Sequence, residues 1–311
     1  MTTSEATKRR RRLRRLGAGL PLAFGLWLLA GWVVAEVVTA PKKGPIETRD
    51  VLPGAAVSDV SAVTEDGIEV HGWLARSSER DVVLLFPGHG GNRRSLLGVA
   101  EHYLARNWSV LLPDLRATGT SGGDQIGLGY QERLDVRAWM DLARDSGFVN
   151  IGLHGQSLGA AAITYSLVES DGDPAAFLVL DSCYDDIRNA LANRLPWLPL
   201  PSLLLKPVEW FATAKINAAI ETLRPLACVE SIRSPVLFVA GDSDSKVLPS
   251  EATQLFEACG STQKRILWIS GGRHTDLWSH DATGYASGLD GFLETLPVQP
   301  AAAASGPSSR R

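Results

Sequence analysis

The fold of this chain is indicated first by the stretch Asn150-Ile151-Gly152-Leu153-His154-Gly155-Gln156-Ser157-Leu158-Gly159. It begins as a short apolar run typical of a buried strand and ends in a G-x-S-x-G pattern, after which Ala160-Ala161-Ala162 favours a helix. A serine between a strand and a helix lies on a sharp turn where glycines relieve the crowding, and its hydroxyl points out of the sheet. The pattern alone is common, so its context decides whether Ser157 is a nucleophile.

Short apolar runs elsewhere in the chain predict further buried strands. They are residues 82–86, 110–112, 151–153, 177–180, 236–240 and 266–269. Stretches with helical periodicity lie at 94–106, 130–144, 158–169, 249–258 and 282–296. Buried strands that alternate with helices predict an α/β fold, with a mostly parallel central sheet and helices on both faces. Segments 56–63 and 68–75 flank the turn Glu65-Asp66-Gly67 and predict an N-terminal antiparallel hairpin at the sheet edge.

Charge is distributed unevenly along the 311 residues, whose net charge is −3. Seven basic residues lie within 8–15, and removal of residues 1–16 leaves 24 basic and 33 acidic residues. A body this acidic argues against nucleic-acid binding, which depends on neutralising phosphates. The cysteines Cys183, Cys228 and Cys259 have no metal-site spacing and are expected as buried thiols, although a Cys228–Cys259 pair stays open. We expect no metal and no organic cofactor.

The N-terminal region has the pattern of a membrane anchor. Residues 17–35 carry no charge and would span about 28 Å as a helix, close to the thickness of a bilayer core. The basic cluster before them predicts a cytoplasmic tail at 1–16, an anchor at 17–40 outside the fold, and an extracytoplasmic body. The alternatives are a buried core helix, a twin-arginine export signal, or a signal peptide cleaved after Val38-Thr39-Ala40 to release a secreted protein; Pro41 disfavours that cleavage.

The remaining chain reads as one domain at residues 45–297, followed by a disordered tail at 298–311 that is rich in alanine, serine and proline. Residues 186–226 interrupt the alternation of strands and helices and are too long for a single crossover helix. They predict a cap of short helices joined by proline-rich turns, which would form an apolar lid over a substrate pocket. An ordinary pair of surface helices is the alternative.

A serine needs a base, and the base needs a group to orient it. His274 lies in a glycine-containing loop directly after the last predicted strand, where it could reach over the sheet. Structural roles are favoured for four of the other histidines, His71, His102, His154 and His280. Asp244 follows the strand at 236–240 and is the preferred acid; its competitor Asp242 would instead stabilise the turn.

The order Ser157, Asp244, His274 along the chain resembles that of the α/β-hydrolases, and the resemblance covers most of residues 50–297. Phe86-Pro87-Gly88-His89-Gly90-Gly91-Asn92 looks like the family's loop after its third strand, although Pro87 stands where the family often has histidine. The resemblance implies an oxyanion hole built from the backbone N–H groups of His89 and Leu158. Residues 113–123 look like the family's Asp-x-Arg-x-x-Gly-x-Ser loop. Within the superfamily, the chain looks most like bacterial serine-aminopeptidase-like and monoacylglycerol-lipase-like members.

This resemblance implies a serine hydrolase that cleaves carboxylic esters through a Ser-His-Asp triad and an acyl-enzyme. The Leu, Trp and Pro content of the predicted cap favours a small-molecule or lipid-like ester with an apolar acyl part. A peptidase or amidase, a thioesterase and an acyltransferase would use the same residues and stay open. A non-catalytic, membrane-tethered binding domain is a further alternative, which the loss of a triad residue would favour; none is missing.

Overall fold

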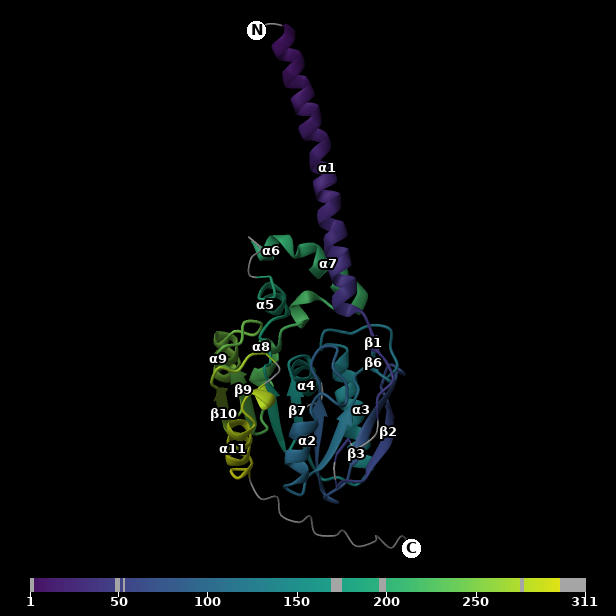
Figure 1. The fold of residues 1–311 in the computed structure, drawn as a ribbon, viewed down its shortest axis with the longest axis vertical. Coiled ribbons are helices and arrows are strands. Elements are labelled where there is room, and N and C mark those ends of the chain that lie inside the picture. The colour runs from purple at the N-terminus through teal and green to yellow at the C-terminus, as the bar shows by residue number, and fades with distance from the viewer. Residues whose placement is uncertain are drawn as a thin grey trace, which may run out of the picture.

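An eight-stranded sheet forms the centre of the computed structural model (Figure 1), which describes residues 3–47, 51–52, 54–168, 175–195, 200–274 and 277–296. Its order is β10-β9-β8-β7-β4-β5-β3-β2, and only β3 runs antiparallel to its neighbours. The strands are β2 (Val57–Val63), β3 (Glu69–Ala75), β4 (Asp81–Phe86), β5 (Ser109–Pro113), β7 (Asn150–Gln156), β8 (Phe177–Asp181), β9 (Val236–Gly241) and β10 (Lys264–Ile269). The predicted α/β class, mostly parallel sheet and edge hairpin are confirmed.

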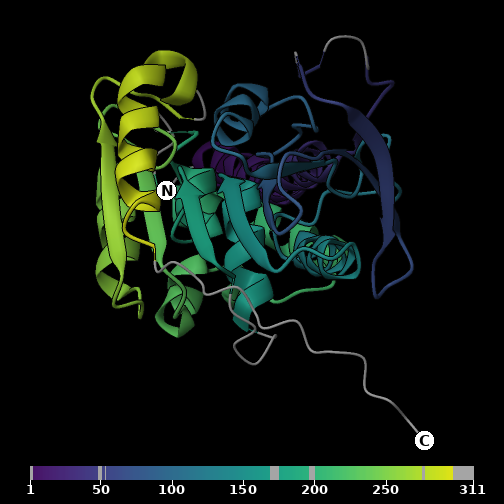
Figure 2. The same cartoon turned by 90° about the horizontal axis from the view of Figure 1, so that it is seen from below.

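Helices cover both faces of this sheet (Figure 2), as the alternating pattern predicts. One apolar core forms where the sheet meets α3 (Glu132–Asp145), α4 (Leu158–Val168) and α9 (Pro249–Ala258). A second core forms on the opposite face against α2 (Leu97–Leu104), α10 (Leu277–His280) and α11 (Ala282–Leu293). Strands such as β4 and β7 are buried on both faces, which is why their sequences are apolar without a period of two.

The chain between β8 and β9 forms short helices, of which α5, α6 and α7 lie above the carboxyl edge of the sheet (Figure 1). They are α5 (Ile187–Ala192), α6 (Pro201–Leu204), α7 (Lys206–Ile216), η1 (Ile220–Thr222), α8 (Pro225–Cys228) and η2 (Val229–Ser231). Prolines lie in the first turn of α7 and of α8, where a missing N–H costs nothing. Asn217 ends α7 in the left-handed conformation. We refer to residues 186–226 as the cap.

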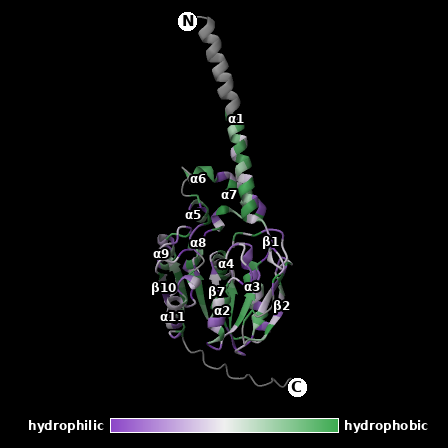
Figure 3. Ribbon diagram, in the orientation of Figure 1, coloured by the Kyte–Doolittle hydropathy of each residue, from purple (hydrophilic) through white to green (hydrophobic). Residues whose placement is uncertain are grey.

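Helix α1 (Thr3–Thr39) projects from the domain beside the cap (Figure 1). Leu20–Thr39 is the single segment of the described chain that is long and apolar enough to cross a membrane, and its colouring in Figure 3 is largely hydrophobic. The helix packs lengthwise against α7. The indole N–H of Trp27 donates to the carbonyl of Leu204 at 3.0 Å, and Lys215 forms an ion pair with Glu36 at 2.6 Å.

The C-terminal end of α1 belongs to the fold, whereas we expected residues 17–40 to lie outside it. Ala35 and Thr39 are fully buried, and the amide of Ile126 donates to the carbonyl of Thr39 at 2.9 Å. The chain then forms β1 (Lys42–Lys43), which pairs in parallel with β6 (Thr118–Gly119). The packed domain therefore begins before residue 45. This start could not be predicted from the sequence, because a two-residue strand has no periodic pattern. The predicted tail at 298–311 lies outside the described residues.

Candidate active site

Ser157 lies on the sharp turn between β7 and α4, as the pentapeptide predicts. Its φ of 50° is a left-handed backbone conformation that is costly for a residue with a side chain. A Cβ added to Gly155 would lie 2.5 Å from the amide nitrogen of Ala160, and one added to Gly159 would collide with the carbonyl oxygen of Phe86. Both glycines are therefore required for the close approach that directs the Ser157 hydroxyl toward His274.

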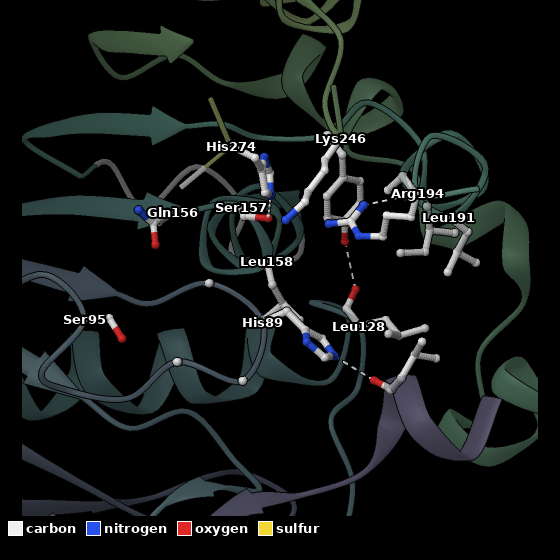
Figure 4. Close-up of a pocket in the computed structure, with 17 residues that line it drawn as sticks. His89, Ser95, Leu128, Gln156, Ser157, Leu158, Leu191, Arg194, Lys246 and His274 are labelled. Atoms are coloured by element: carbon white, nitrogen blue, oxygen red, sulfur yellow. Dashed lines mark hydrogen bonds between the residues drawn. The ribbon is translucent and has the colours of Figure 1, made fainter. Parts of the chain in front are cut away.

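Two hydrogen bonds join Ser157 to His274 and His274 to Asp244 (Figure 4 shows the first). The Oγ atom of Ser157 is 3.0 Å from Nε2 of His274. The Nδ1 atom of the same ring is 2.8 Å from Oδ2 of Asp244. The three residues follow β7, β9 and β10, so the parallel strands bring them together at one edge of the sheet. The structure thus assembles the three side chains selected from the sequence.

The carboxylate of Asp244 is fixed on its other side by the backbone. Its Oδ1 atom accepts hydrogen bonds from the amides of Lys246 at 2.8 Å and Val247 at 3.0 Å. Burial alone would raise the pKa of Asp244, but the hydrogen bonds from His274 and these amides outweigh burial and lower it below the usual value. Asp244 is therefore held as an anion that faces the His274 ring.

The competing acid and the remaining histidines have other partners. Asp242 accepts a hydrogen bond from the amide of Gly271 at 2.7 Å and stabilises that turn. The buried ring of His154 lies 3.2 Å from the hydroxyls of both Tyr103 and Tyr285. Burial lowers the pKa of His154 to about 3, so this ring is neutral. His71 lies on β3, His102 contacts Asp290, and His280 contacts the carbonyl of Ser270.

The loop after β4 lies directly against the turn at Ser157. A Cβ added to Gly88 would be 3.6 Å from Cβ of Ser157. The loop is tied down through Arg93, whose backbone and side chain donate to the buried carboxylate of Asp114 at 2.7–3.0 Å. The Asp-x-Arg pattern at residues 114–116 thus has a structural use, because Asp114 orients the loop that carries His89.

Two backbone N–H groups near Ser157 have no acceptor within the described part of the chain. They belong to His89 in the loop after β4 and to Leu158, the first residue of α4. An amide in the first turn of a helix has no partner within that helix. Both were selected from the family resemblance, and both lie in the wall of the pocket described next.

The side chains of Ser157 and His274 line a pocket of about 670 Å³ (Figure 4). The pocket lies between the sheet edge, the cap and the end of α1. Its lining residues are Val38, Gly88, His89, Gly90, Gly91, Ser95, Leu128, Gln156, Ser157, Leu158, Tyr184, Ile187, Ala190, Leu191, Arg194, Lys246 and His274. The sequence did not single out Val38, Arg194 or Lys246, because nothing in the local pattern of each residue indicates that it faces the pocket.

Helix α1 reaches this pocket through its last turn. The Nε2 atom of His89 lies 2.7 Å from the carbonyl oxygen of Val38. Desolvation of the ring lowers the pKa of His89, and the nearby cations Arg194 and Lys42 add to this effect against the Val38 hydrogen bond. The neutral His89 ring therefore connects the loop after β4 to the membrane-compatible helix.

No group of three or more His, Cys, Asp or Glu residues within the described ranges is arranged to hold a metal ion. Cys183, Cys228 and Cys259 form no disulfide within the described residues, and the first and last are buried. The optional Cys228–Cys259 disulfide is thus not formed in this structure.

Comparison with known proteins agrees with this fold. No protein-family model matches it. An uncharacterized protein of Mycobacterium tuberculosis (strain CDC 1551 / Oshkosh) is 31% identical over 294 residues, covering 90% of this chain and 96% of that protein. WAV2, an alpha/beta hydrolase domain-containing protein of Arabidopsis thaliana, is 23% identical, covering 87% and 92%. The structure of a Pyrococcus furiosus esterase superimposes with a TM-score of 0.68 at 22% identity, covering 83% and 97%. With its sheet order and its serine turn, the chain has the α/β-hydrolase fold.

Proposed function

We propose that the protein is a membrane-anchored serine hydrolase that cleaves carboxylic esters with an apolar acyl part. The observation that carries the proposal is the hydrogen-bonded line from Ser157 through His274 to Asp244 at the floor of the pocket. A hydroxyl within 3.0 Å of an imidazole that a carboxylate orients has the geometry of an activated nucleophile.

In the proposed first step, Oγ of Ser157 attacks the ester carbonyl carbon while Nε2 of His274 accepts the hydroxyl proton. Asp244 holds the His274 ring in the tautomer that leaves Nε2 free, and it stabilises the imidazolium that forms. Collapse of the tetrahedral intermediate breaks the bond to the alcohol oxygen, which takes the proton from His274. The products of this step are the free alcohol and an ester between Ser157 and the acyl group.

Water completes the cycle in the second step. His274 removes a proton from the water, the hydroxyl oxygen adds to the acyl carbon, and Ser157 leaves with the proton that His274 returns. In both steps the negative oxygen would accept hydrogen bonds from the backbone N–H groups of His89 and Leu158, which have no acceptor within the described residues. One such donor typically contributes about 3 kcal/mol to transition-state stabilisation.

The apolar wall of the pocket supports the proposed substrate class. Leu128, Leu158, Ile187 and Leu191 all line it, so an acyl chain would bury its surface there. The named esterase activity of the similar Pyrococcus furiosus structure agrees with an ester substrate. An amidase or an acyltransferase would show a different product pattern in the experiment below.

We further propose that α1 stays attached as a single-pass anchor, with the N-terminus in the cytoplasm and the hydrolase domain outside. Cleavage after Ala40 would remove Val38 from the pocket wall and the buried Thr39 from the core, which supports an uncleaved helix. Protease added to intact cells should digest an epitope placed after residue 296 and spare one placed before residue 8. The reverse pattern would contradict the orientation.

A fluorophosphonate probe tests the nucleophile. The probe should label the wild-type protein and fail to label Ser157→Ala, whose folding is checked by thermal unfolding. Absence of labelling in the folded wild-type protein would contradict the hydrolase proposal. A panel of p-nitrophenyl esters of increasing acyl length, run beside aminoacyl p-nitroanilides, then separates esterase from amidase. Product analysis with an added alcohol acceptor identifies an acyltransferase.

A further inference from the structure

Two cationic side chains, Arg194 and Lys246, line the pocket that holds Ser157, and none of the described residues in its wall is a carboxylate. This composition is notable in a chain that has 34 acidic and 31 basic residues. Both side chains extend toward the part of the pocket occupied by Ser157 (Figure 4). The pocket is therefore positively charged, although the net charge of the chain is −3.

Hydrogen bonds fix the Arg194 side chain and the backbone of Lys246 at the junction of the cap and the sheet. Arg194 donates through Nη1 to the carbonyl of Ala190, one turn earlier in the cap. Its neighbour Asn193 donates to the carbonyl of Lys246 at 3.2 Å and to Glu251 on α9 at 2.5 Å. The amide of Lys246 is bound to Asp244 at 2.8 Å. The same contacts that close the cap against the loop after β9 thus bring the two cations together.

Neither Arg194 nor Lys246 has an ion-pair partner within the described ranges. Other cations near the cap do, because Arg188 pairs with Glu221 at 2.7 Å and Lys206 pairs with Glu209 at 2.7 Å. Burial lowers the pKa of Arg194 by more than the nearby carboxylates of Asp244 and Glu251 raise it. Asp244 acts on this charge from nearby, but its oxygens are already engaged by His274 and the loop amides. A bound anion would relieve this cost.

We propose that Arg194 and Lys246 bind an anionic group of the substrate, so that the preferred ester carries a phosphate or a carboxylate near its scissile bond. This inference rests on the proposed hydrolase function and narrows its substrate class. Arginine presents paired N–H donors to either anion, and lysine adds a point charge. Together with the apolar wall, the two cations make the site suitable for an acylated molecule that has one apolar end and one anionic end.

Two matched pairs of esters test the inference and separate its two anion sources. The first pair is 1-oleoyl-glycerol and 1-oleoyl-glycerol 3-phosphate in neutral detergent micelles, which differ by the phosphate alone. The second pair is mono-p-nitrophenyl glutarate and its methyl ester, which differ in the free carboxylate. We expect the full-length protein to show a kcat/KM at least about tenfold higher for the anionic member of one pair, and the pair that responds identifies the anion. The preference should weaken as salt screens the charges.

Substitution of each cation tests whether these two residues cause the preference. Arg194→Gln and Lys246→Gln should each lower the ratio of anionic to neutral kcat/KM about tenfold, mainly through a higher KM for the anionic ester. Lys264→Gln is the matched control, because Lys264 lies at the start of β10, whereas the pocket lies at the carboxyl ends of the strands. It should leave the ratio at its wild-type value. Fluorophosphonate labelling confirms that each variant is folded.

An equal kcat/KM for both members of both pairs would overturn the inference, and so would a preference that both glutamine variants keep. Either result leaves the proposed hydrolase intact as long as the neutral esters are cleaved and Ser157 is labelled. Failure of the hydrolase itself looks different, because a folded protein would then cleave neither member of either pair and would not react with the probe.

Discussion

Ser157 keeps its strained backbone conformation at the pocket because the residues around it leave the backbone no alternative. Its amide donates to the carbonyl of Asp181 at the end of the neighbouring strand at 2.7 Å, and helix α4 begins at the next residue. Gly155 and Gly159 leave no room for a side chain. The left-handed φ of Ser157 is thus imposed by strand pairing and helix packing together.

Asp244→Asn tests the orienting role at the scale of one atom. The amide oxygen can still accept from Lys246 and Val247, so the fold should be retained and the melting temperature should change little. The amide nitrogen would donate toward His274 and favour the wrong tautomer. We expect ester hydrolysis to fall about a thousandfold to ten-thousandfold in kcat.

Asp242→Asn is the matched control on the same loop. Asp242 holds the turn at Gly271 and does not contact His274 in the structure. Its substitution should change kcat by less than about threefold. Equal losses in the two variants would show that loop structure, and not the orientation of His274, limits the rate.

The candidate catalytic residues that follow the ends of strands could be predicted from the sequence. Ser157, Asp244 and His274 each follow an apolar run, so a parallel sheet was enough to predict that they meet. Arg194 and Lys246 could not be found in this way. They line the same pocket because Asn193 donates a hydrogen bond to the carbonyl of Lys246, and such a contact leaves no spacing pattern in the chain.

At the scale of elements, the packing of α1 against α7 connects the anchor to the cap. Gly31 is the point of closest approach, because a Cβ there would collide with Pro207. Trp27 packs edge-on against Trp210 with ring centroids 5.9 Å apart. The cap is therefore held from the side by α1 and from below by the sheet (Figure 1).

Gly31→Leu should separate the two helices. Overpacking at such a contact typically costs about 1–3 kcal/mol, so we expect a lower melting temperature and slower fluorophosphonate labelling. Gly25→Leu is the matched control on the same helix, since a Cβ there meets nothing within 4 Å. Both variants remain apolar and should stay in the membrane fraction. Equal behaviour of the two would contradict the α1–α7 contact.

The elements that sequence predicted well are those with long periodic patterns. The expected helix at 249–258 matches α9 (Pro249–Ala258), and the expected hairpin matches β2 and β3. The pairing of β1 with β6 and the packed end of α1 were not predicted. An apolar segment of membrane length has the same composition whether its end is free or buried, so only the tertiary structure separates the two cases.

At the scale of the whole molecule, stability should depend on pH through Glu251. Burial and the neighbouring Asp185 carboxylate raise the pKa of Glu251 from 4.5 to about 7. The folded protein thus keeps a proton that the unfolded chain releases near pH 4.5. By linkage, the stabilisation is full below pH 4.5 and is lost as the pH rises through 7.

Glu251→Gln should remove this dependence. Its amide oxygen can accept from Asn193 and Leu248 as Glu251 does, and its nitrogen can donate toward Asp185. Thermal unfolding at pH 5 and pH 8 should show a fall in the wild-type melting temperature of about 2–4 °C from this group. The variant should show a smaller fall. An unchanged pH slope would assign the effect to other groups.

The hydrogen bond between His89 and the carbonyl of Val38 has a mechanical consequence. A transmembrane helix adjusts its tilt to the hydrophobic thickness of the surrounding bilayer. Since α1 ends in the pocket wall, any change in its tilt acts as a lever on the loop that carries His89. If α1 crosses the membrane as we propose, the lipid composition would therefore act on the shape of the pocket through the tilt of this helix.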